Sequence, residues 1–338
     1  MQTVDIHMHL LSSEVQFNRF YDKLALKFFG KKMGIDHKEL IQNPYKAYTH
    51  TLTKNIRESK YLSKTVLFGV DAKVDTKGKE VARDITVCAS NDDLLKLYEQ
   101  NSDIIIPFFS INPMRADALD LIDKYSSLGF KGAKFLQNYW GVDTRDKKYR
   151  AYFEKLKEKN LPLIIHIGSE SSVDSIKEYE KIEMLKHPLE VGVDVVAAHM
   201  ALTYKPTKIF KALSSNPKNF NKEYYILLDM LREHDNLYAD ISAILTPVRA
   251  KVLKHLSKEQ DIHHKLLYGT DYPLPFSTIF NSYNLSYKKR FELSKITNPF
   301  DRYTQTILEY FDEDNPIFSN YKKVIESSSC HTPSQNQG

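Results

Sequence analysis

Cysteine is scarce in this sequence of 338 residues, which contains only Cys88 and Cys330. Two cysteines this far apart, the second in a stretch rich in serine, glutamine and asparagine, do not form the disulfide framework that holds small secreted domains together. A hydrophobic core must therefore stabilise the fold, and 42% hydrophobic residues suffice for one. We expect a cytoplasmic protein, because residues 3–10 are already typical of a strand and leave no room for an export signal.

Long apolar runs and clusters of one charge are also missing. No run approaches the roughly 18 apolar residues of a membrane helix, so we expect no membrane partner. The 48 basic and 43 acidic side chains are mixed along the chain, whereas a nucleic-acid-binding surface gathers basic side chains on one face. The expected partner is a small-molecule substrate, and the formal net charge of +5 is compatible with an anionic one.

The sequence does contain eight short apolar runs, separated mostly by helical patterns. Several, such as Leu163-Ile164-Ile165, are continuously apolar, which is typical of parallel strands covered on both faces. Asn43-Pro44 is typical of a helix start. Strands alternating with helices predict an α/β fold, a (β/α)8 TIM barrel. A doubly wound open sheet is the alternative, but no glycine-rich phosphate loop follows any run. The predicted strands are Thr3–Leu10, Thr65–Asp71, Ile104–Asn112, Phe130–Leu136, Leu161–Gly168, Asp194–Met200, Leu237–Ser242 and Lys265–Tyr272.

Two segments exceed a minimal barrel. The distance between the first two runs predicts a helical insertion at about residues 11–43, and extra helices are expected after the eighth run. We predict one domain over residues 1–326 and a disordered tail at 327–338. The aromatic segment Tyr283–Phe291 is a candidate interface of a homo-oligomer, although such segments also simply cover barrels.

Residues of the metal-ligand type stand at the C-terminal ends of these runs. His7 and His9 are two positions apart, so that both imidazoles are expected to face the barrel axis. His166 ends the fifth run, His199 the sixth and Asp271 the eighth. One histidine alone is more often a satisfied core residue, but five such residues share the face where barrel enzymes place their active sites. Imidazoles with a carboxylate suit Zn²⁺, and also Mn²⁺, Fe²⁺ or Co²⁺.

In this order the residues resemble the amidohydrolase superfamily, in particular its mononuclear branch, which includes aminocarboxymuconate-semialdehyde decarboxylase and related lactone hydrolases. One departure is Met200-Ala201 after His199, where many relatives carry a glycine; the larger side chain is expected to narrow the pocket. The matching stretches are Asp5-Ile6-His7-Met8-His9, Gly129-Phe130-Lys131-Gly132-Ala133-Lys134, His166, His199, Leu237-Tyr238-Ala239-Asp240-Ile241-Ser242 and Gly269-Thr270-Asp271-Tyr272-Pro273.

The resemblance implies a role for each residue of the constellation. Asp271 would take a proton from a metal-activated water and pass it to the leaving group. His199 would act as an acid or base, stabilise the oxyanion, or serve as a fifth ligand. One divalent ion, with zinc as the first choice, would be held by His7, His9, His166 and Asp271.

Two further residues are candidate substrate contacts. Lys134 ends the fourth run, and binding of a substrate carboxylate is favoured there over a carbamate that bridges two metals, as in dinuclear relatives, and over a plain salt bridge. Trp140, the only tryptophan, follows in a loop at the catalytic face, where it either lines the pocket or packs against a neighbouring loop. Asp240, near the seventh strand, either orients a ligand or caps local backbone.

Three functions remain open. The first is hydrolysis of a small amide, lactone or related carbonyl compound. The second is non-oxidative decarboxylation of an unsaturated acid at the same site, which fold resemblance alone cannot separate from the first. Hydrolysis is favoured because substrate loops such as Ser169–Ser172 lack a cluster of arginines for a di-acid. The third is a catalytically inactive binding protein on the same barrel, against which the five competent residues weigh.

Overall fold

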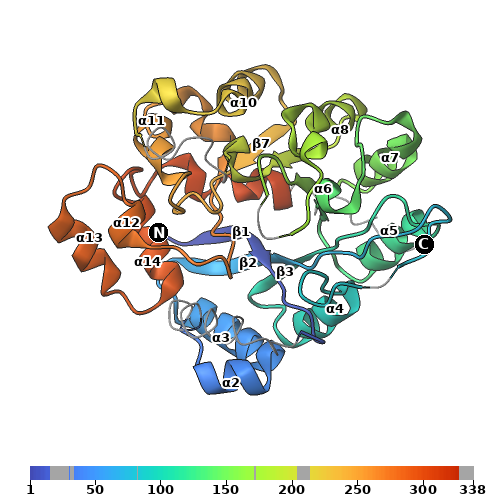
Figure 1. Cartoon of the computed structure of the whole chain (residues 1–338), viewed down its shortest axis with the longest axis horizontal. Coiled ribbons are helices and arrows are strands. Elements are labelled where there is room, and N and C mark those ends of the chain that lie inside the picture. The colour runs from blue at the N-terminus through green and yellow to red at the C-terminus, as the bar shows by residue number, and fades with distance from the viewer. Residues whose placement is uncertain (16–29, 31–33, 82, 171–172, 204–213, 327–338) are drawn as a thin grey trace, which may run out of the picture.

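Eight parallel strands form the centre of the structure, a computed structural model, and helices surround them (Figure 1). The structure describes residues 1–15, 30, 34–81, 83–170, 173–203 and 214–326. Each strand overlaps one predicted run, so all eight predicted strands are confirmed. They are β1 (Thr3–His9), β2 (Leu62–Phe68), β3 (Ile105–Phe108), β4 (Ala133–Phe135), β5 (Leu163–Ile165), β6 (Val195–Ala197), β7 (Leu237–Asp240) and β8 (Leu266–Leu267).

The strands follow one another around a closed barrel in chain order. Strands β1 to β3 and strands β4 to β8 form two sheets with parallel pairing. A bridge between Phe109 and Ala133 joins the end of β3 to β4, and a bridge between Met8 and Tyr272 joins β1 to the segment that follows β8. The predicted (β/α)8 barrel is therefore confirmed, and the open doubly wound sheet is excluded.

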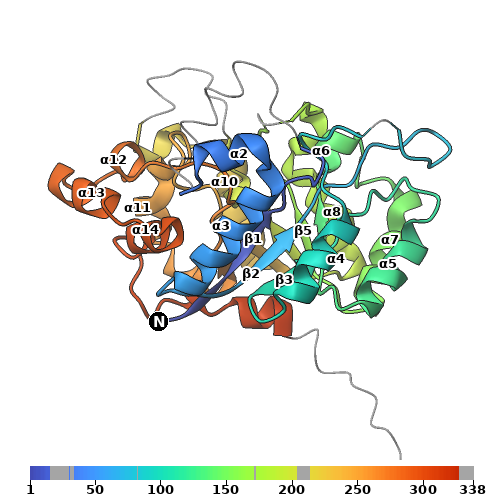
Figure 2. The same ribbon diagram turned by 90° about the horizontal axis from the view of Figure 1, so that it is seen from below.

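Helices cover the outside of the barrel. Asn43 caps α3 as predicted, because its side chain accepts a hydrogen bond from the N–H of Lys46 while Pro44 occupies the first turn. Figure 2 shows α3 and α4 lying over the strands β1 to β3. The α-helices of the described residues are α2 (His37–Gln42), α3 (Pro44–Glu58), α4 (Asn91–Gln100), α5 (Ala118–Ser127), α6 (Gln137–Trp140), α7 (Arg150–Glu158), α8 (Lys186–Val191), α10 (Lys222–Glu233), α11 (Leu253–Leu256), α12 (Thr278–Asn281), α13 (Tyr287–Ser294) and α14 (Pro299–Ile307).

Additional segments extend the minimal barrel at two places. Of the predicted insertion, the structure describes α2 and its flanks, whereas residues 16–29 and 31–33 lie outside the described residues, as does the predicted tail at 327–338. The extra helices predicted after the eighth strand are present as α12, α13 and α14. The division into a single domain over 1–326 stays a prediction. In the described part of the chain no helix is long and apolar enough to cross a bilayer.

Successive side chains along each strand point in opposite directions. One set fills the interior of the barrel, and the other set packs against the helices. The outward positions, such as Leu163 and Ile165, belong to a large core cluster shared with the helices. Because both faces of each strand are covered, the runs are continuously apolar rather than alternating. The inward positions form a second cluster, here called the inner cluster, made of Val4, Ile6, Val66, Phe68, Phe108, Ile164, Val196, Ala198 and Leu267, with Val324 and Ile325 packed on it.

Strand β1 departs from regular alternation just before the first two predicted ligands. Its register against β2 shifts between Asp5 and Met8. As a result two consecutive residues face the interior: Ile6 belongs to the inner cluster, and His7 contacts the interior side chain of Lys134. Bulges of this kind often re-aim a side chain next to an active site.

Asp5 stabilises this irregular segment and connects it to the segment that follows β8, which lies beside β1. Its Oδ1 accepts the N–H of His7 at 2.9 Å and the N–H of Thr270 at 3.2 Å. Thr270 directly precedes Asp271, so one buried carboxyl positions the backbone of two predicted ligands at once. Burial raises the pKa of Asp5 to about 7.

Replacing Asp5 by alanine is expected to lower the free energy of unfolding by on the order of 2 kcal/mol, because two buried N–H groups lose their acceptor. Asp5→Asn keeps an acceptor oxygen and removes the cost of a buried carboxylate above the raised pKa, so it should lose less stability at mildly alkaline pH. Urea denaturation of chelator-treated protein measures both variants. Equal losses would contradict the role of Asp5 as an acceptor.

Candidate metal centre

A cavity of about 440 Å³ opens at the C-terminal ends of the strands. Four residues of the predicted constellation line it, namely His9, His166, His199 and Asp271. Glu170 and Arg249 add one charge of each sign to the wall, and sequence motifs marked neither of them. The remaining wall is largely apolar and includes Leu10, Leu11, Val70, Val87, Leu136, Val173, Pro273, Leu274 and Pro275.

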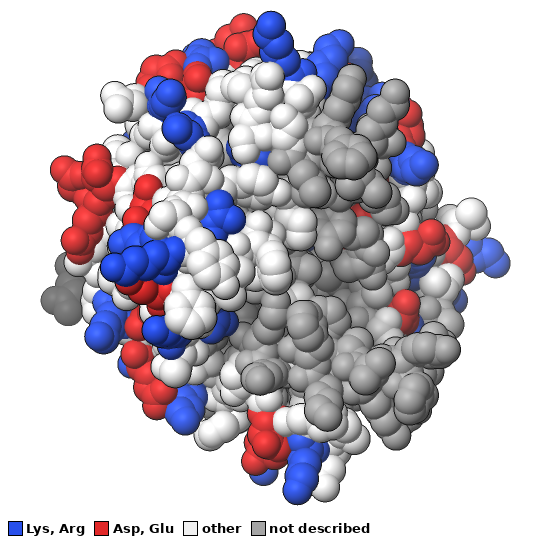
Figure 3. Space-filling view, turned by 60° about the vertical axis from the view of Figure 1, so that its left-hand side comes forward, with Lys and Arg blue, Asp and Glu red and all other residues white. Residues whose placement is uncertain are grey.

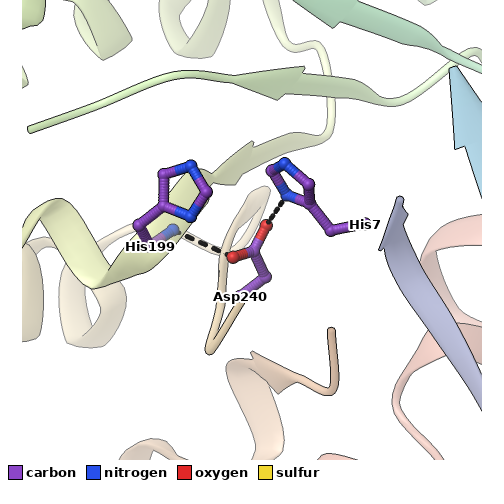
Figure 4. A group of neighbouring side chains, drawn as sticks. All are labelled: His7, His199 and Asp240. Atoms are coloured by element: carbon purple, nitrogen blue, oxygen red, sulfur yellow. Dashed lines mark hydrogen bonds and ion pairs between the residues drawn. The ribbon is translucent and has the colours of Figure 1, made fainter. Parts of the chain in front are cut away.

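His7 is fully buried and is held by Asp240 (Figure 4). Nδ1 of His7 lies 2.7 Å from Oδ2 of Asp240. An ionised carboxylate can only accept hydrogen bonds, so Nδ1 carries the proton and Nε2 keeps its lone pair, which is the form that binds a metal. Burial alone would raise the pKa of Asp240, but the interaction with His7 and the hydrogen bond from Ser242 hold it below its ordinary value. Asp240 therefore orients His7.

The same carboxylate fixes His199, partly through Ser242. The N–H of His199 donates to Oδ1 of Asp240 at 2.9 Å, and the hydroxyl of Ser242 donates to the same oxygen. Because that hydroxyl proton is committed to Asp240, Oγ of Ser242 accepts from Nδ1 of His199, 2.8 Å away. Burial holds the pKa of His199 well below its ordinary value. His199 is thus neutral, with Nε2 as the acceptor on its ring.

His9, His7 and Asp271 form a compact donor group. Oδ1 of Asp271 lies 3.2 Å from Nε2 of His9 and 3.5 Å from Nε2 of His7. Burial alone would raise the pKa of Asp271, but the hydrogen bond to His9 and electrostatic interactions with His7, His9 and Lys134 hold it well below its ordinary value. Burial also lowers the pKa of His7 to about 4. His7 and Asp271 are therefore a neutral imidazole and an ionised carboxylate, which are the forms that bind a metal.

This donor group fits a divalent ion. Its three ligand atoms lie within 4.8 Å of one another, and both donor types suit zinc and its first-row neighbours. A second group with the same spacing, made of His7, His199 and Asp240, is held together by the hydrogen bonds described above.

His166 lines the same cavity but lies outside the donor group. Its ring centroid is 5.1 Å from that of His199, and its Nε2 lies 3.2 Å from the carbonyl oxygen of Gly168 and 3.6 Å from Oε2 of Glu170. Burial lowers its pKa to about 4. Of the four predicted ligands, the structure gathers three and places the fourth beside Glu170, so ligation by His166 stays a prediction.

Lys134 does not line the cavity. It is fully buried inside the barrel, where Nζ lies 3.1 Å from Nε2 of His7 and over the ring of Phe68. Burial lowers its pKa to about 8. Phe108 fills the space beside Gly132, two positions before Lys134, since a Cβ at Gly132 would lie 2.4 Å from that ring. The structure thus places Lys134 against a predicted ligand, and it places Arg249 in the cavity wall.

Trp140 also lies away from the cavity wall. Its ring packs edge-on against Phe135, and its indole N–H donates to the carbonyl of Asp71 at 2.8 Å. The position of Trp140 matches the packing alternative rather than a pocket contact.

Left-handed backbone occurs at the strand ends that carry the site. The φ angles are 59° at His199, 53° at Met200 and 66° at Asp271. Such angles cost free energy in residues with a Cβ, and they persist where the surrounding structure enforces them. A glycine would adopt this conformation without strain, and Met200-Ala201 does so at a cost. Met200 is buried away from the cavity wall, so it does not narrow the pocket as expected.

Comparison with known proteins places the chain in a family. A model of the amidohydrolase family matches residues 4–292. No curated protein sequence matches the chain.

Several solved structures share the fold along nearly the whole chain. A probable 2-pyrone-4,6-dicarboxylic acid hydrolase from Acinetobacter baumannii is 14% identical with a TM-score of 0.53, covering 96% of this chain and 100% of that one. 2,6-Dihydroxybenzoate decarboxylase is 13% identical with a TM-score of 0.53, covering 97% and 99%. An amidohydrolase from Burkholderia multivorans with bound zinc is 12% identical with a TM-score of 0.51, covering 97% and 98%. At these identities the likeness supports the fold alone, whereas the family model spans most of the sequence, and the chain therefore belongs to the amidohydrolase family.

Proposed function

We propose that this amidohydrolase is a metal-dependent hydrolase of a small carbonyl compound such as a lactone or an amide. The observation that carries the proposal is the donor group of His7, His9 and Asp271, which brings two imidazoles and a carboxylate together beside an open cavity. Zinc is the proposed ion, since it suits these donors and a relative of the same fold contains it. His166, in the same cavity wall, is proposed as the further ligand.

The chain's own residues supply the proton transfers. A divalent ion in the donor group would provide Lewis acidity and an ionised water at neutral pH. Asp271, ionised by its surroundings, would take a proton from the attacking water and pass it to the leaving group. His199 presents Nε2 as an acceptor, so in this state it orients or deprotonates the water rather than donating to an oxyanion. The oxyanion role implied by the resemblance is therefore the less favoured one.

The cavity wall favours a substrate that carries a carboxylate on an apolar body. Arg249 lines the cavity beside the histidines. Its positive charge adds to the effect of burial in lowering the pKa of both His166 and His199. Arginine binds carboxylates through two parallel hydrogen bonds. The substrates named for the hydrolase and the decarboxylase of the same fold are likewise carboxylic acids. We propose Arg249, in place of Lys134, as the anchor of the substrate's carboxylate.

The reaction class is tested by incubating zinc-loaded protein with a panel of lactones and a panel of unsaturated or aromatic carboxylic acids. Ring opening without CO₂ release is expected, because the cavity offers proton acceptors for an attacking water. His7→Ala should lose bound metal and activity together, whereas His50→Ala, on the exposed side of α3, should keep both. Release of CO₂ as the main product would establish the decarboxylase alternative, and metal-free protein that zinc cannot rescue would support an inactive binding protein.

Asp240→Asn is expected to weaken metal affinity by roughly 10- to 100-fold, because the amide can donate to Nδ1 of His7 and so stabilise the wrong tautomer. Competition with a fluorescent chelator measures the affinity. Asp229→Asn, a change on the outer surface of α10, is the matched control. Unchanged affinity in Asp240→Asn would show that the hydrogen bond to His7 does not set the tautomer.

Arg249→Gln is expected to raise KM for a carboxylate-bearing lactone by roughly 10-fold or more, since a charge-assisted hydrogen bond contributes about 1.5–3 kcal/mol. The KM for the methyl ester of the same lactone should be nearly unaffected. Arg249→Lys should raise the KM for the acid by an intermediate factor, because lysine keeps the positive charge without the two parallel N–H donors of arginine. Arg150→Gln on the exposed side of α7 is the control. Equal effects on acid and ester would contradict the anchor.

A further inference from the structure

Three aromatic side chains are exposed on α12 and α13, two helices that pack against each other. Phe280 is 76% exposed, Tyr287 71% and Phe291 46%. Tyr287 and Phe291 stand one turn apart on α13, and their rings stack with centroids 6.5 Å apart. We call these three residues the aromatic patch. The other large hydrophobic side chains that are exposed in the described part of the chain are aliphatic and lie far from it in sequence, namely Val81, Leu119, Leu128 and Ile176.

The patch is held firmly against the body of the protein. Arg290 donates to the carbonyls of Leu285 at 2.9 Å and Ile279 at 3.3 Å, which links α13 to α12. Asn281 donates to the carbonyl of Leu245 at 2.7 Å and so anchors α12 to the loop after β7. The helices are therefore well anchored, and looseness of the helices is not the reason why the rings are exposed. A preordered surface loses little conformational entropy when it binds a partner.

Charges of both signs lie next to the patch. In Figure 3, which brings the α12–α13 side forward, uncharged atoms are bordered by basic and acidic groups. Lys289 pairs with Glu309 at 2.8 Å. An open groove of about 450 Å³ runs along the same segment and is lined by Asn284, Leu285, Ser286, Lys288, Lys289, Glu292 and Glu309.

This mixture of charges indicates which partner the patch fits. An anionic membrane or a nucleic acid attracts a surface of one positive sign, and Glu292 and Glu309 stand among the lysines here. In a twofold interface each residue meets a different residue of the other copy, so a surface with both signs can complement itself. We propose that the aromatic patch and its charged groove form the interface of a homodimer.

The dimensions suit such an interface. Aromatic side chains of roughly 150–250 Å² each make the patch large enough to supply on the order of half of the roughly 800 Å² that each partner buries in a standard interface. Aromatic residues also dominate the binding energy of interfaces, with neighbouring polar groups excluding water. The proposal is independent of the chemistry at the metal centre.

Sedimentation velocity of the full chain across micromolar concentrations tests the proposal. The expected mass is twice the monomer mass of 39.3 kDa. The double variant Phe280→Ser/Phe291→Ser should weaken self-association by at least about tenfold, because each buried ring contributes more than the 1.4 kcal/mol that tenfold corresponds to. Circular dichroism should remain as in the wild type, since both side chains are exposed and the fold of the protomer does not depend on them.

The matched control is Val81→Ser/Leu128→Ser, which removes two exposed apolar side chains elsewhere on the surface. This control should dimerise like the wild type. A wild-type protein that stays monomeric, or a patch variant that dimerises as well as the control, would overturn the proposal. Monomeric protein that co-sediments with vesicles of anionic phospholipid in a patch-dependent way would also overturn it, in favour of a membrane surface as the partner.

Discussion

The carboxylate of Asp240 is the constraint on which the rest of the site depends. It accepts from Nδ1 of His7, from the N–H of His199 and from the hydroxyl of Ser242, which in turn accepts from Nδ1 of His199. One fully buried acidic residue therefore leaves Nε2 of both histidines as lone-pair donors. Neutral imidazole is stable there because burial opposes a positive charge on either ring. Without that acceptor the rings could adopt the other tautomer, and the cavity would present donors where the proposed chemistry needs acceptors.

A second constraint is geometric, and it separates the stable part of the barrel from the strained part. The inner cluster, made of aliphatic and aromatic side chains with Val324 and Ile325 packed on it, stabilises the interior below the site. Above it, β1 carries a bulge that Asp5 holds, and His199 and Asp271 adopt left-handed backbone. The free energy from burying the core offsets this local strain. Glycine could relieve the strain, but Met200 and Ala201 occupy left-handed positions in this chain.

The barrel can be predicted from the sequence because the continuous apolar composition of each strand indicates that the strand is buried on both faces. Continuous apolar runs and helix caps are local signals, and the eight strands and the start of α3 follow from them. Strand ends also locate the five polar residues, since parallel strands direct their C-terminal ends to one face. The bulge is not visible in the pattern, because it depends on a contact between Asp5 and Thr270, 265 positions apart. The positions of Lys134, Trp140 and Arg249 relative to the cavity do not follow from the pattern for a similar reason. Strand alternation does not say whether an inward side chain reaches the cavity or stops in the core, and loop conformation decides which loop residues enter it.

The position of Arg249 bears on the choice between hydrolysis and decarboxylation, which the donor group alone leaves open. Decarboxylation converts a carboxylate into neutral CO₂, so a cation that binds that carboxylate stabilises the ground state more than the transition state and opposes the reaction. In hydrolysis the same cation binds a carboxylate that does not react, and the binding energy can position the carbonyl for attack. Asp271 and His199, both in acceptor form, serve water attack directly. The proposed arginine anchor, together with two proton acceptors in one cavity, is therefore better matched to hydrolysis of a carboxylate-bearing carbonyl compound than to loss of the carboxylate itself.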